Sequence, residues 1–389
     1  MLKGEIYMKQ VTLTADMLVT GDGALNYLEN VDYTKAVIIT GGSSMLRTGV
    51  IDKIKSIMKA ENREIAVFSG ISKNPTTDQV MQGLEFIKKE QPDCIIAVGG
   101  GSAIDAAKVM LIFYDFPEYN FDNVIQRMGE LDSLKTKTKF IAVPSTSGTA
   151  SEVTKVSVIT YAKDQIKRPI RSINMFPDIA ILDPDLPMTL PKRIAAETGM
   201  DALTHALESY INKNGNDFTD ALAKEAIEGL INWLPISVNE GTKEAREHVH
   251  NYQCMAGMAF ANSGLGVVHG ISHALGGKYN IAHGLANAII LPYSMDYNKK
   301  DTDTARKYEK LSRIIGCSII EKVRQVKREV EIPETIKEAG IDEDTFKNDK
   351  EFLIESAMLG PTGVNPVKVS KEDMSKILDC IYYGRQVDF

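Results

Sequence analysis

The sequence predicts an α/β N-terminal domain built on a parallel sheet, followed by an all-α C-terminal domain. Short apolar runs alternate with helical stretches in the first half of the chain, a pattern typical of a parallel sheet that is buried on both faces. Prolines at positions 184, 187 and 191 follow, and most later segments have helical periodicity. With 389 residues, the chain is also longer than one hydrophobic core usually supports.

The strands and helices of the first half follow from these runs. Strands are expected at 36–40, 65–68, 94–98 and 140–143, and helices at 49–59, 77–90 and 102–110. Strands joined by helices form a parallel sheet with right-handed crossovers. Such a sheet binds its ligands at the carboxyl ends of its strands, so the turns after these strands are the first places to search for a site.

The character of the sequence changes near residues 183–187. Beyond them, helices are expected at 194–211, 219–233, 243–261, 302–315 and 319–329. We therefore expect an α/β domain over residues 1–184 and an all-helical domain over residues 185–389.

Composition restricts the partners and the compartment. The formal net charge of −7 argues against a nucleic-acid partner, because phosphate binding needs a concentrated basic surface. No apolar run reaches the roughly 18 residues of a membrane span, and the first residues have no signal-peptide core. The four scattered cysteines, 94, 254, 317 and 380, indicate free thiols in a reducing compartment. A cytoplasmic protein without a membrane partner is expected.

Four of the six histidines and one aspartate fall into two short stretches that could bind a metal. Asp201 and His205 are four residues apart, so on a helix they project from one face, about 5–6 Å apart at Cβ. His269 and His273 have the same spacing, and His283 follows a glycine-containing turn. Imidazoles with one carboxylate suit Fe²⁺, Zn²⁺, Co²⁺ or Ni²⁺ better than Mg²⁺ or Ca²⁺. A catalytic metal needs an open position, so one histidine should lie outside the ligand set.

A simpler interpretation of the same residues stays open at this point. An Asp-x-x-x-His pair is common, and a buried histidine is more often part of a structural hydrogen-bond network than a ligand. The remaining histidines, His248 and His250, lie in a polar predicted helix and are expected at the surface.

Two turns rich in glycine and hydroxyl groups follow predicted strands. Residues 99–102 are Gly-Gly-Gly-Ser and open a helix, where glycines allow a pyrophosphate to approach the backbone and the helix N-terminus supplies donors. The fingerprint G-x-G-x-x-G is met only loosely, so a tight structural turn is the alternative. Residues 144–152 contain many hydroxyls, which suit phosphate, ribose or nicotinamide, or cap a helix.

Together these segments resemble the iron-containing (group III) alcohol dehydrogenases. The matching segments span nearly the whole chain, at 74–76, 99–108, 144–154, 177–184, 199–206 and 264–287. The resemblance implies a dehydroquinate-synthase-like fold, with a dinucleotide-binding domain, a helical domain and a cleft between them. It also implies a metal-dependent enzyme that transfers a hydride between a nicotinamide cofactor and a small primary alcohol or diol, or the corresponding aldehyde.

The resemblance further implies roles for individual residues. The metal, Fe²⁺ with Zn²⁺ as the alternative, is expected on Asp201, His205, His269 and His283. His273 is expected near the nicotinamide, outside the ligand set, as the catalytic candidate for a proton relay. Cofactor contacts are expected from Asn74, Gly100, Gly101, Ser102, Thr146, Ser147, Thr149, Lys167 and Leu186. Phe260 and Val158 are expected to line a small apolar cleft, and a homodimer or larger homo-oligomer is expected.

One departure concerns the turn after the first predicted strand. NAD-preferring relatives often have an aspartate there, which bonds the ribose hydroxyls and repels a 2′-phosphate. Here the turn is Gly41, Gly42, Ser43 and Ser44, without a carboxylate, and Arg47 follows. This turn leaves room for the phosphate, so we expect NADP(H) to be preferred over NAD(H).

Other enzyme classes share this architecture. A zinc-dependent polyol dehydrogenase of the glycerol type, using NAD, typically has three protein ligands, fewer than the four candidates here. A dehydroquinate-synthase-like lyase needs a cluster of Lys and Arg for a phosphorylated substrate, and the segment around Asp201 has none. A non-catalytic binding protein would bind metal and cofactor without turnover.

Overall fold

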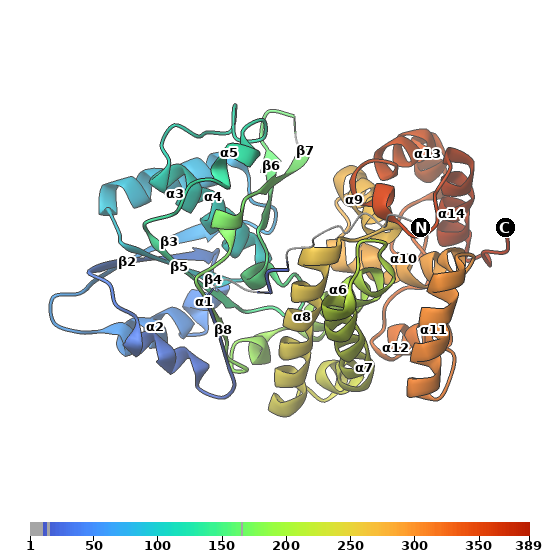
Figure 1. Cartoon of the computed structure of the whole chain (residues 1–389), viewed down its shortest axis with the longest axis horizontal. Helices are drawn as coiled ribbons and strands as arrows, with labels where there is room; N and C mark the ends of the chain where they lie inside the picture. The colour runs from blue at the N-terminus through green and yellow to red at the C-terminus, as the bar shows by residue number, and fades with distance from the viewer. Residues whose placement is uncertain (1–10, 14–15, 165) are drawn as a thin grey trace, which may run out of the picture.

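The computed structural model describes residues 11–13, 16–164 and 166–389. The strands and the helices α1 to α5 lie together on one side, and the helices α6 to α14 lie on the other (Figure 1). The last strand of the main sheet ends at Leu182 and α6 begins at Lys192. We propose the domain boundary after residue 184, within this connection.

The first part contains a six-stranded sheet that is parallel throughout, with the strand order β1-β8-β5-β4-β2-β3. The strands are β1 (Met17–Thr20), β2 (Lys35–Gly41), β3 (Glu64–Ile71), β4 (Cys94–Gly99), β5 (Lys139–Pro144) and β8 (Ile179–Leu182). The four strands expected from the apolar runs are confirmed. The analysis missed β1 and β8, which have only four residues each, and the antiparallel hairpin of β6 (Val156–Tyr161) and β7 (Ile166–Arg171).

Helices cover both faces of this sheet. They are α1 (Ser44–Arg47), α2 (Val50–Met58), α3 (Thr77–Glu90), α4 (Gly101–Asp115) and α5 (Met128–Leu131). Alternate residues of a strand point to opposite faces. Val37 and Ile39 therefore pack in the cluster that contains α3 and α4, whereas Ala36 and Ile38 pack in the cluster that contains α2.

The register of the sheet brings the predicted turns to one edge. Thr40 of β2 pairs with Val98 of β4, and Gly99 pairs with Pro144 of β5. Because the strands are parallel, the turns that follow β2, β4 and β5 leave the sheet at the same edge. These are the three turns at 41–44, 99–102 and 144–149 from which the sequence predicted cofactor contacts.

The second part is helical from residue 192 to the C-terminal segment, and no strand occurs in this fully described range. Its helices are α6 (Lys192–Ile211), α7 (Asp217–Asn239), α8 (Lys243–Ser263), α9 (Val267–Tyr279), α10 (His283–Asn298), α11 (Thr302–Ile315), α12 (Ile319–Glu329), α13 (Glu343–Ala357) and α14 (Lys371–Tyr383). Within the described chain, no single helix is long and apolar enough to cross a membrane; α8 and α9 pass that test only as a pair bent by 101°.

Helices α9, α10, α13 and α14 were not predicted from the sequence, and for α9 and α10 there is a physical reason. Both helices are buried on most sides, so they lack the polar face that reveals a helix in a sequence. Glycines in α9 also weaken its intrinsic helix propensity. Gly270 is needed there, because a Cβ at this position would lie 1.9 Å from Thr362 Oγ1.

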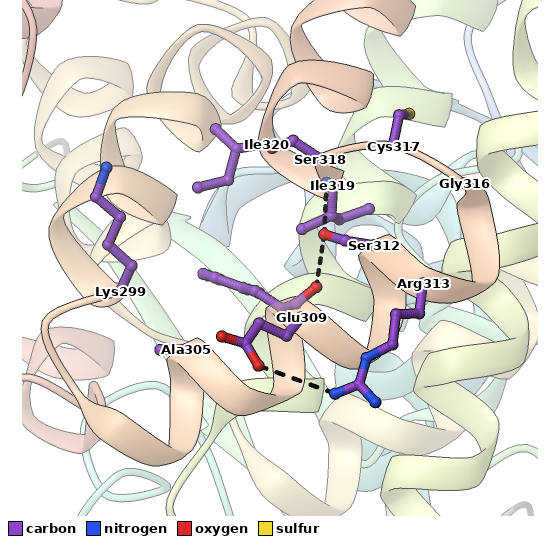
Figure 2. A pocket seen from close by; sticks show the side chains of 11 residues that line it. Lys299, Ala305, Glu309, Ser312, Arg313, Gly316, Cys317, Ser318, Ile319 and Ile320 are labelled. Atoms are coloured by element: carbon purple, nitrogen blue, oxygen red, sulfur yellow. Dashed lines mark hydrogen bonds and ion pairs between the residues drawn. The ribbon is translucent and has the colours of Figure 1, made fainter.

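A surface hollow of about 760 Å³ lies between α11 and α12 (Figure 2). Several of its polar groups have partners within the two helices: Ser312 Oγ donates to Tyr308 O and accepts from Ile319 N, and Glu309 pairs with Arg313. None of the residues that the sequence singled out for metal, cofactor or substrate lines this hollow. The candidate site therefore lies elsewhere.

Candidate metal centre and cofactor-binding turns

Asp201, His205, His269 and His283 converge at one point in the helical part. One potential ligand atom from each lies within 4.8 Å of the others. Asp201 Oδ1 is 3.8 Å from His205 Nε2 and 3.9 Å from His283 Nε2. Donor atoms 3.8–3.9 Å apart can share a cation with bonds of about 2.0–2.2 Å, because two such bonds span at most about 4.4 Å. The structure thus brings together the four residues that the family resemblance implied as ligands.

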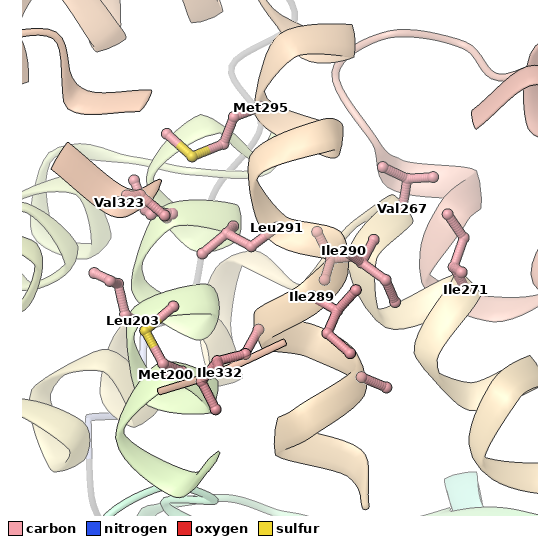
Figure 3. Close-up of a cluster of buried hydrophobic side chains, with 14 of the residues drawn as sticks. Met200, Leu203, Val267, Ile271, Ile289, Ile290, Leu291, Met295, Val323 and Ile332 are labelled. Carbon is pink, nitrogen blue, oxygen red and sulfur yellow. The ribbon is translucent and has the colours of Figure 1, made fainter. Parts of the chain in front are cut away.

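Three helices position these side chains. Asp201 and His205 lie one turn apart on α6, His269 lies in the first turn of α9, and His283 is the first residue of α10. A dry core holds the three helices together, and Figure 3 shows its side chains. It includes Met200 and Leu203 of α6, Val267 and Ile271 of α9, and Ile289 and Leu291 of α10.

The centre is buried except beside His283. The side chains of Asp201, His205 and His269 are nearly inaccessible, whereas that of His283 is 37% exposed. Burial, followed by the charges of the neighbouring histidines, holds the pKa of His269 well below its usual range. Its imidazole is therefore neutral at pH 7 and has a lone pair for a cation.

The second nitrogen of each of the three histidines in this cluster already has a partner. His205 Nδ1 is 3.2 Å from Gly148 O, His269 Nδ1 is 2.6 Å from Glu208 Oε2, and His283 Nδ1 is 3.4 Å from Ser272 Oγ. Outer partners of this kind leave Nε2 free to face a metal. The donor set and its orientation therefore fit a divalent cation.

Asn287 supports the same conclusion. Its Nδ2 lies 2.6 Å from Asp201 Oδ1, 3.1 Å from His269 Nε2 and 3.2 Å from His283 Nε2, while its buried Oδ1 has no partner. An amide with two hydrogens thus faces three acceptors. The lone pairs of these ligands point to a shared position, as a cation site requires. The sequence analysis did not single out Asn287.

His273 lies beside this cluster and is not one of its four members. Its ring stacks on the His283 ring, with centroids 5.3 Å apart, and remains exposed. The Phe260 ring stacks on the His205 ring, with centroids 4.4 Å apart. Val158 lies on β6, where its N–H donates to Asp105.

The two glycine- and hydroxyl-rich turns touch each other. Gly100 is the N-cap of α4, and Gly101 is its first residue. A Cβ at Gly101 would lie 2.6 Å from Thr149 Oγ1, and one at Gly100 would lie 3.4 Å from Thr146 Cγ2. The backbone N–H groups at the start of α4 and the partly exposed Thr146 and Thr149 thus border one site. A helix N-terminus beside hydroxyls suits a pyrophosphate.

The other expected cofactor contacts lie around these turns. Gly41 N is 3.8 Å from a Cβ built at Gly99, Ser102 Oγ donates to Lys73 O, and Lys167 Nζ donates to Asn74 Oδ1 at 2.9 Å. Gly42, Ser43 and Ser44 are exposed. Leu186 is buried in the core, so only its backbone is available to a ligand.

His250 is a correction to the sequence analysis, which placed it at the surface. Its side chain is buried, its Nδ1 lies 2.9 Å from Ser147 Oγ, and burial lowers its pKa to about 4. His248 is half-buried, with its ring 4.1 Å from that of Trp233. The polar composition of α8 indicated solvent, but its polar side chains pack against the turn that carries Ser147. The Ser147 hydroxyl is therefore turned inward.

Lys108 is a second group that sequence reasoning missed. It is fully buried, and its Nζ lies 2.7–3.0 Å from five oxygens of Ser151, Thr154 and Val156. On the same helix face, Asp105 accepts from Ser151 Oγ at 2.6 Å. Burial lowers the pKa of Lys108 to about 8, although the charges of Asp105 and Glu152 oppose this shift. Helix α4 thus anchors the segment that follows the hydroxyl-rich turn.

Comparison with known proteins agrees with this geometry. Residues 16–184 match the iron-containing alcohol dehydrogenases, and residues 195–382 match the C-terminal part of the same family. The chain belongs to the iron-containing alcohol dehydrogenase family. It is therefore an oxidoreductase that acts on alcohols and aldehydes, and this family membership favours the dehydrogenase over the lyase and the binding protein.

Individual relatives of this alcohol dehydrogenase cover most of its length. The NADPH-dependent butanol dehydrogenase of Clostridium saccharobutylicum is 43% identical over 393 residues, which cover 98% of this chain and 100% of the relative. The 1-propanol dehydrogenase of Citrobacter freundii is 39% identical over 298 residues, covering 76% and 75%. The solved iron-containing alcohol dehydrogenase of Thermococcus thioreducens has a TM-score of 0.90 and 34% identity, covering 97% and 100%.

Proposed function

We propose that this alcohol dehydrogenase uses NADP(H) to interconvert small primary alcohols or diols and their aldehydes, with Fe²⁺ held by Asp201, His205, His269 and His283. The observation that carries the proposal is the convergence of these four side chains next to the hydroxyl-rich turn. The contact between His205 Nδ1 and Gly148 O joins the two. A metal held there lies close to a cofactor that binds through Thr146 and Thr149.

Iron is proposed from the family and from the ligand types. Imidazole and carboxylate ligands suit Fe²⁺, but Zn²⁺ binds such sites more tightly in the usual affinity order. The metal in a purified sample will therefore depend on preparation. A fourth protein ligand distinguishes the site from the three-ligand centre expected of a zinc polyol dehydrogenase.

Each part of the site has a separate task in this proposal. The cation, when bound, supplies Lewis acidity that stabilises negative charge on the substrate oxygen, and NADPH supplies the hydride for reduction. The start of α4, with Gly100 and Gly101, binds the pyrophosphate, and Thr146 and Thr149 orient the ribose and nicotinamide. Phe260 closes one side of the centre and excludes water from His205.

The preference for NADP(H) rests on the turn after β2. Residues 41–48 contain no carboxylate and include the exposed Arg47. A Cβ at Gly42 would meet nothing within 4 Å, so the turn has free space beside it. The 43% identity to a butanol dehydrogenase whose name specifies NADPH supports the same preference.

A substrate panel with both cofactors tests substrate class and cofactor together. We expect anaerobically Fe²⁺-reconstituted enzyme to reduce C2–C6 aldehydes, with kcat/KM for NADPH above that for NADH. The variant Gly42→Asp adds a carboxylate in open space and is expected to reverse the ratio by repelling the 2′-phosphate. Gly129→Asp, at another position with open space around it, is the matched control. A wild-type ratio that favours NADH would end the cofactor proposal, and inactivity on all aldehydes would end the substrate proposal.

His273 is proposed as the proton relay, because it is exposed beside His283 without belonging to the ligand set. Replacing His273 by alanine is expected to lower kcat by about 10²-fold, the lower end of what general acid–base catalysis contributes. The metal content, measured by atomic emission, should stay at the wild-type level. Unchanged kcat would refute the relay, and loss of the metal would instead make His273 part of the metal centre.

We also propose a cytoplasmic homo-oligomer. All four cysteines are free, as expected in a reducing compartment. The edge strand β1 carries the exposed side chains of Met17 and Leu18. Exposed edge strands invite pairing with another chain, and a second copy of this chain would cover them.

A further inference from the structure

The three histidines of the centre differ in the groups that hold their outer nitrogens. His205 faces a backbone carbonyl at 3.2 Å and His283 faces a hydroxyl at 3.4 Å. Only His269, among these three, faces a carboxylate, Glu208, at 2.6 Å. A contact of 2.6 Å is shorter and stronger than the contacts of 3.2 and 3.4 Å at the other two rings. His269 is therefore the ligand most firmly oriented from outside.

Glu208 is itself fixed on both oxygens. It lies on α6, seven residues after Asp201, and its side chain is 3% exposed. Its Oε1 accepts from Val268 N at 2.7 Å, in the first turn of α9, while Oε2 faces His269 Nδ1. Gly266 permits this approach, because a Cβ there would lie 2.9 Å from Glu208 Oε1. The carboxylate thus caps α9 and holds its histidine at the same time.

We propose that Glu208 is a positioning residue that keeps the proton of His269 on Nδ1, leaves Nε2 free for the cation, and thereby sets the metal affinity of the centre. This inference rests on the proposed metal site. Burial raises the pKa of Glu208 to about 8, and the backbone N–H groups of Gly266, Val268 and His269 oppose this shift. A cation on the far side of His269 also favours the ionised carboxylate.

Glutamine at this position would reverse the hydrogen bond. The Val268 N–H can only donate, so the single amide oxygen of Glu208→Gln must face it. The amide NH₂ then faces His269 Nδ1, which has to accept. The imidazole proton moves to Nε2, the atom that points to the cation, and blocks its lone pair. Shape and hydrogen-bond number are nearly conserved, so the change is mainly in the tautomer.

The first measurement is the affinity of the metal-stripped full chain for Zn²⁺, in competition with a chromogenic chelator. Glu208→Gln is expected to raise the Kd by about 10–100-fold, the usual cost of losing an outer partner of a metal ligand. Glu197→Gln is the matched control: this buried glutamate on the same helix pairs with Arg193 instead of a histidine. It should stay within about threefold of wild type.

The second measurement is the His269 tautomer itself, by long-range ¹H–¹⁵N NMR of histidine-labelled, metal-free protein at about pH 9, above the pKa of Glu208. His269 signals are those that disappear in His269→Ala. Wild type should show the Nδ1–H form and Glu208→Gln the Nε2–H form. An Nε2–H form in wild type overturns the proposal, even if Glu208→Gln does not fold.

Asp201→Ala, titrated with Zn²⁺ in parallel, distinguishes a failure of the positioning role of Glu208 from a failure of the proposed metal site. If Asp201→Ala loses Zn²⁺ and Glu208→Gln binds it within about threefold of wild type, Glu208 has no positioning role and the metal site stands. If Asp201→Ala also binds Zn²⁺ like wild type, the metal site itself is wrong. Loss in both variants, with Glu197→Gln unchanged, supports the proposal.

Discussion

Replacing Asp201 by alanine is expected to abolish metal retention and turnover together. Asp201 is the only carboxylate of the four-residue cluster, and its Oδ1 lies within 4 Å of both His205 Nε2 and His283 Nε2. Without it, three imidazoles remain, and none of the remaining candidate ligands carries a negative charge to offset the cation. Loss of Lewis-acid stabilisation worth several kcal/mol should lower kcat/KM by about 10³-fold or more, because each 1.36 kcal/mol corresponds to a factor of ten.

Metal content by atomic emission and kcat/KM with an aldehyde and NADPH are the two readouts. Asp303→Ala is the control, since this aspartate is 83% exposed and pairs only with Arg306 on α11. It should match wild type in both. An Asp201→Ala variant that is metal-free but fully active would show that turnover does not need the metal. A variant that keeps its metal would show that Asp201 is not a ligand.

Replacing Lys108 by methionine is expected to cause a large loss of stability. Methionine approximates the volume of the lysine but removes the five contacts of Nζ and the positive charge that faces Asp105 and Glu152. Both carboxylates are buried. Leaving buried charges without their partner typically costs about 3–5 kcal/mol. The midpoint of urea unfolding should fall accordingly.

Two further variants identify the cause. Lys88→Met removes a surface pair with Glu85 and should cost less than about 1 kcal/mol. The double variant Lys108→Met/Asp105→Asn should recover part of the loss, because one uncompensated charge is removed. An unfolding midpoint of Lys108→Met equal to that of wild type would show that the buried lysine does not stabilise the segment after the hydroxyl-rich turn.

The sequence predicted the elements whose physical signal is local. The strands β2, β4 and β5 are continuous apolar runs because the sheet is covered on both faces. Helices α3, α11 and α12 were predicted with their observed bounds, since each has one polar and one apolar face. Helices α9 and α10, buried on most sides, carry no such periodicity and were missed.

The candidate site divides in the same way. Asp201 and His205 could be grouped from the sequence because four residues make about one helical turn. The absence of a carboxylate in the turn after β2, and hence the room for a 2′-phosphate, could be predicted from its residue types alone. His250 was wrongly expected at the surface because α8 has a polar composition, which usually indicates contact with solvent. In the structure, His250 instead contacts Ser147 in the other half of the chain.

By itself, the sequence determined which residue types were available to build a site. These are a carboxylate and imidazoles at helical spacing, glycines after a strand, and a turn that contains no carboxylate. Only the tertiary structure decided which of them meet. The separation of His205 from His269 along the chain says nothing about their distance in space, and it is the packing of α6 against α9 and α10 that places their rings 4.8 Å apart. The contacts of Glu208 and Lys108 arise in the same way, because hydrogen-bond partners and burial depend on neighbours that are remote in the sequence.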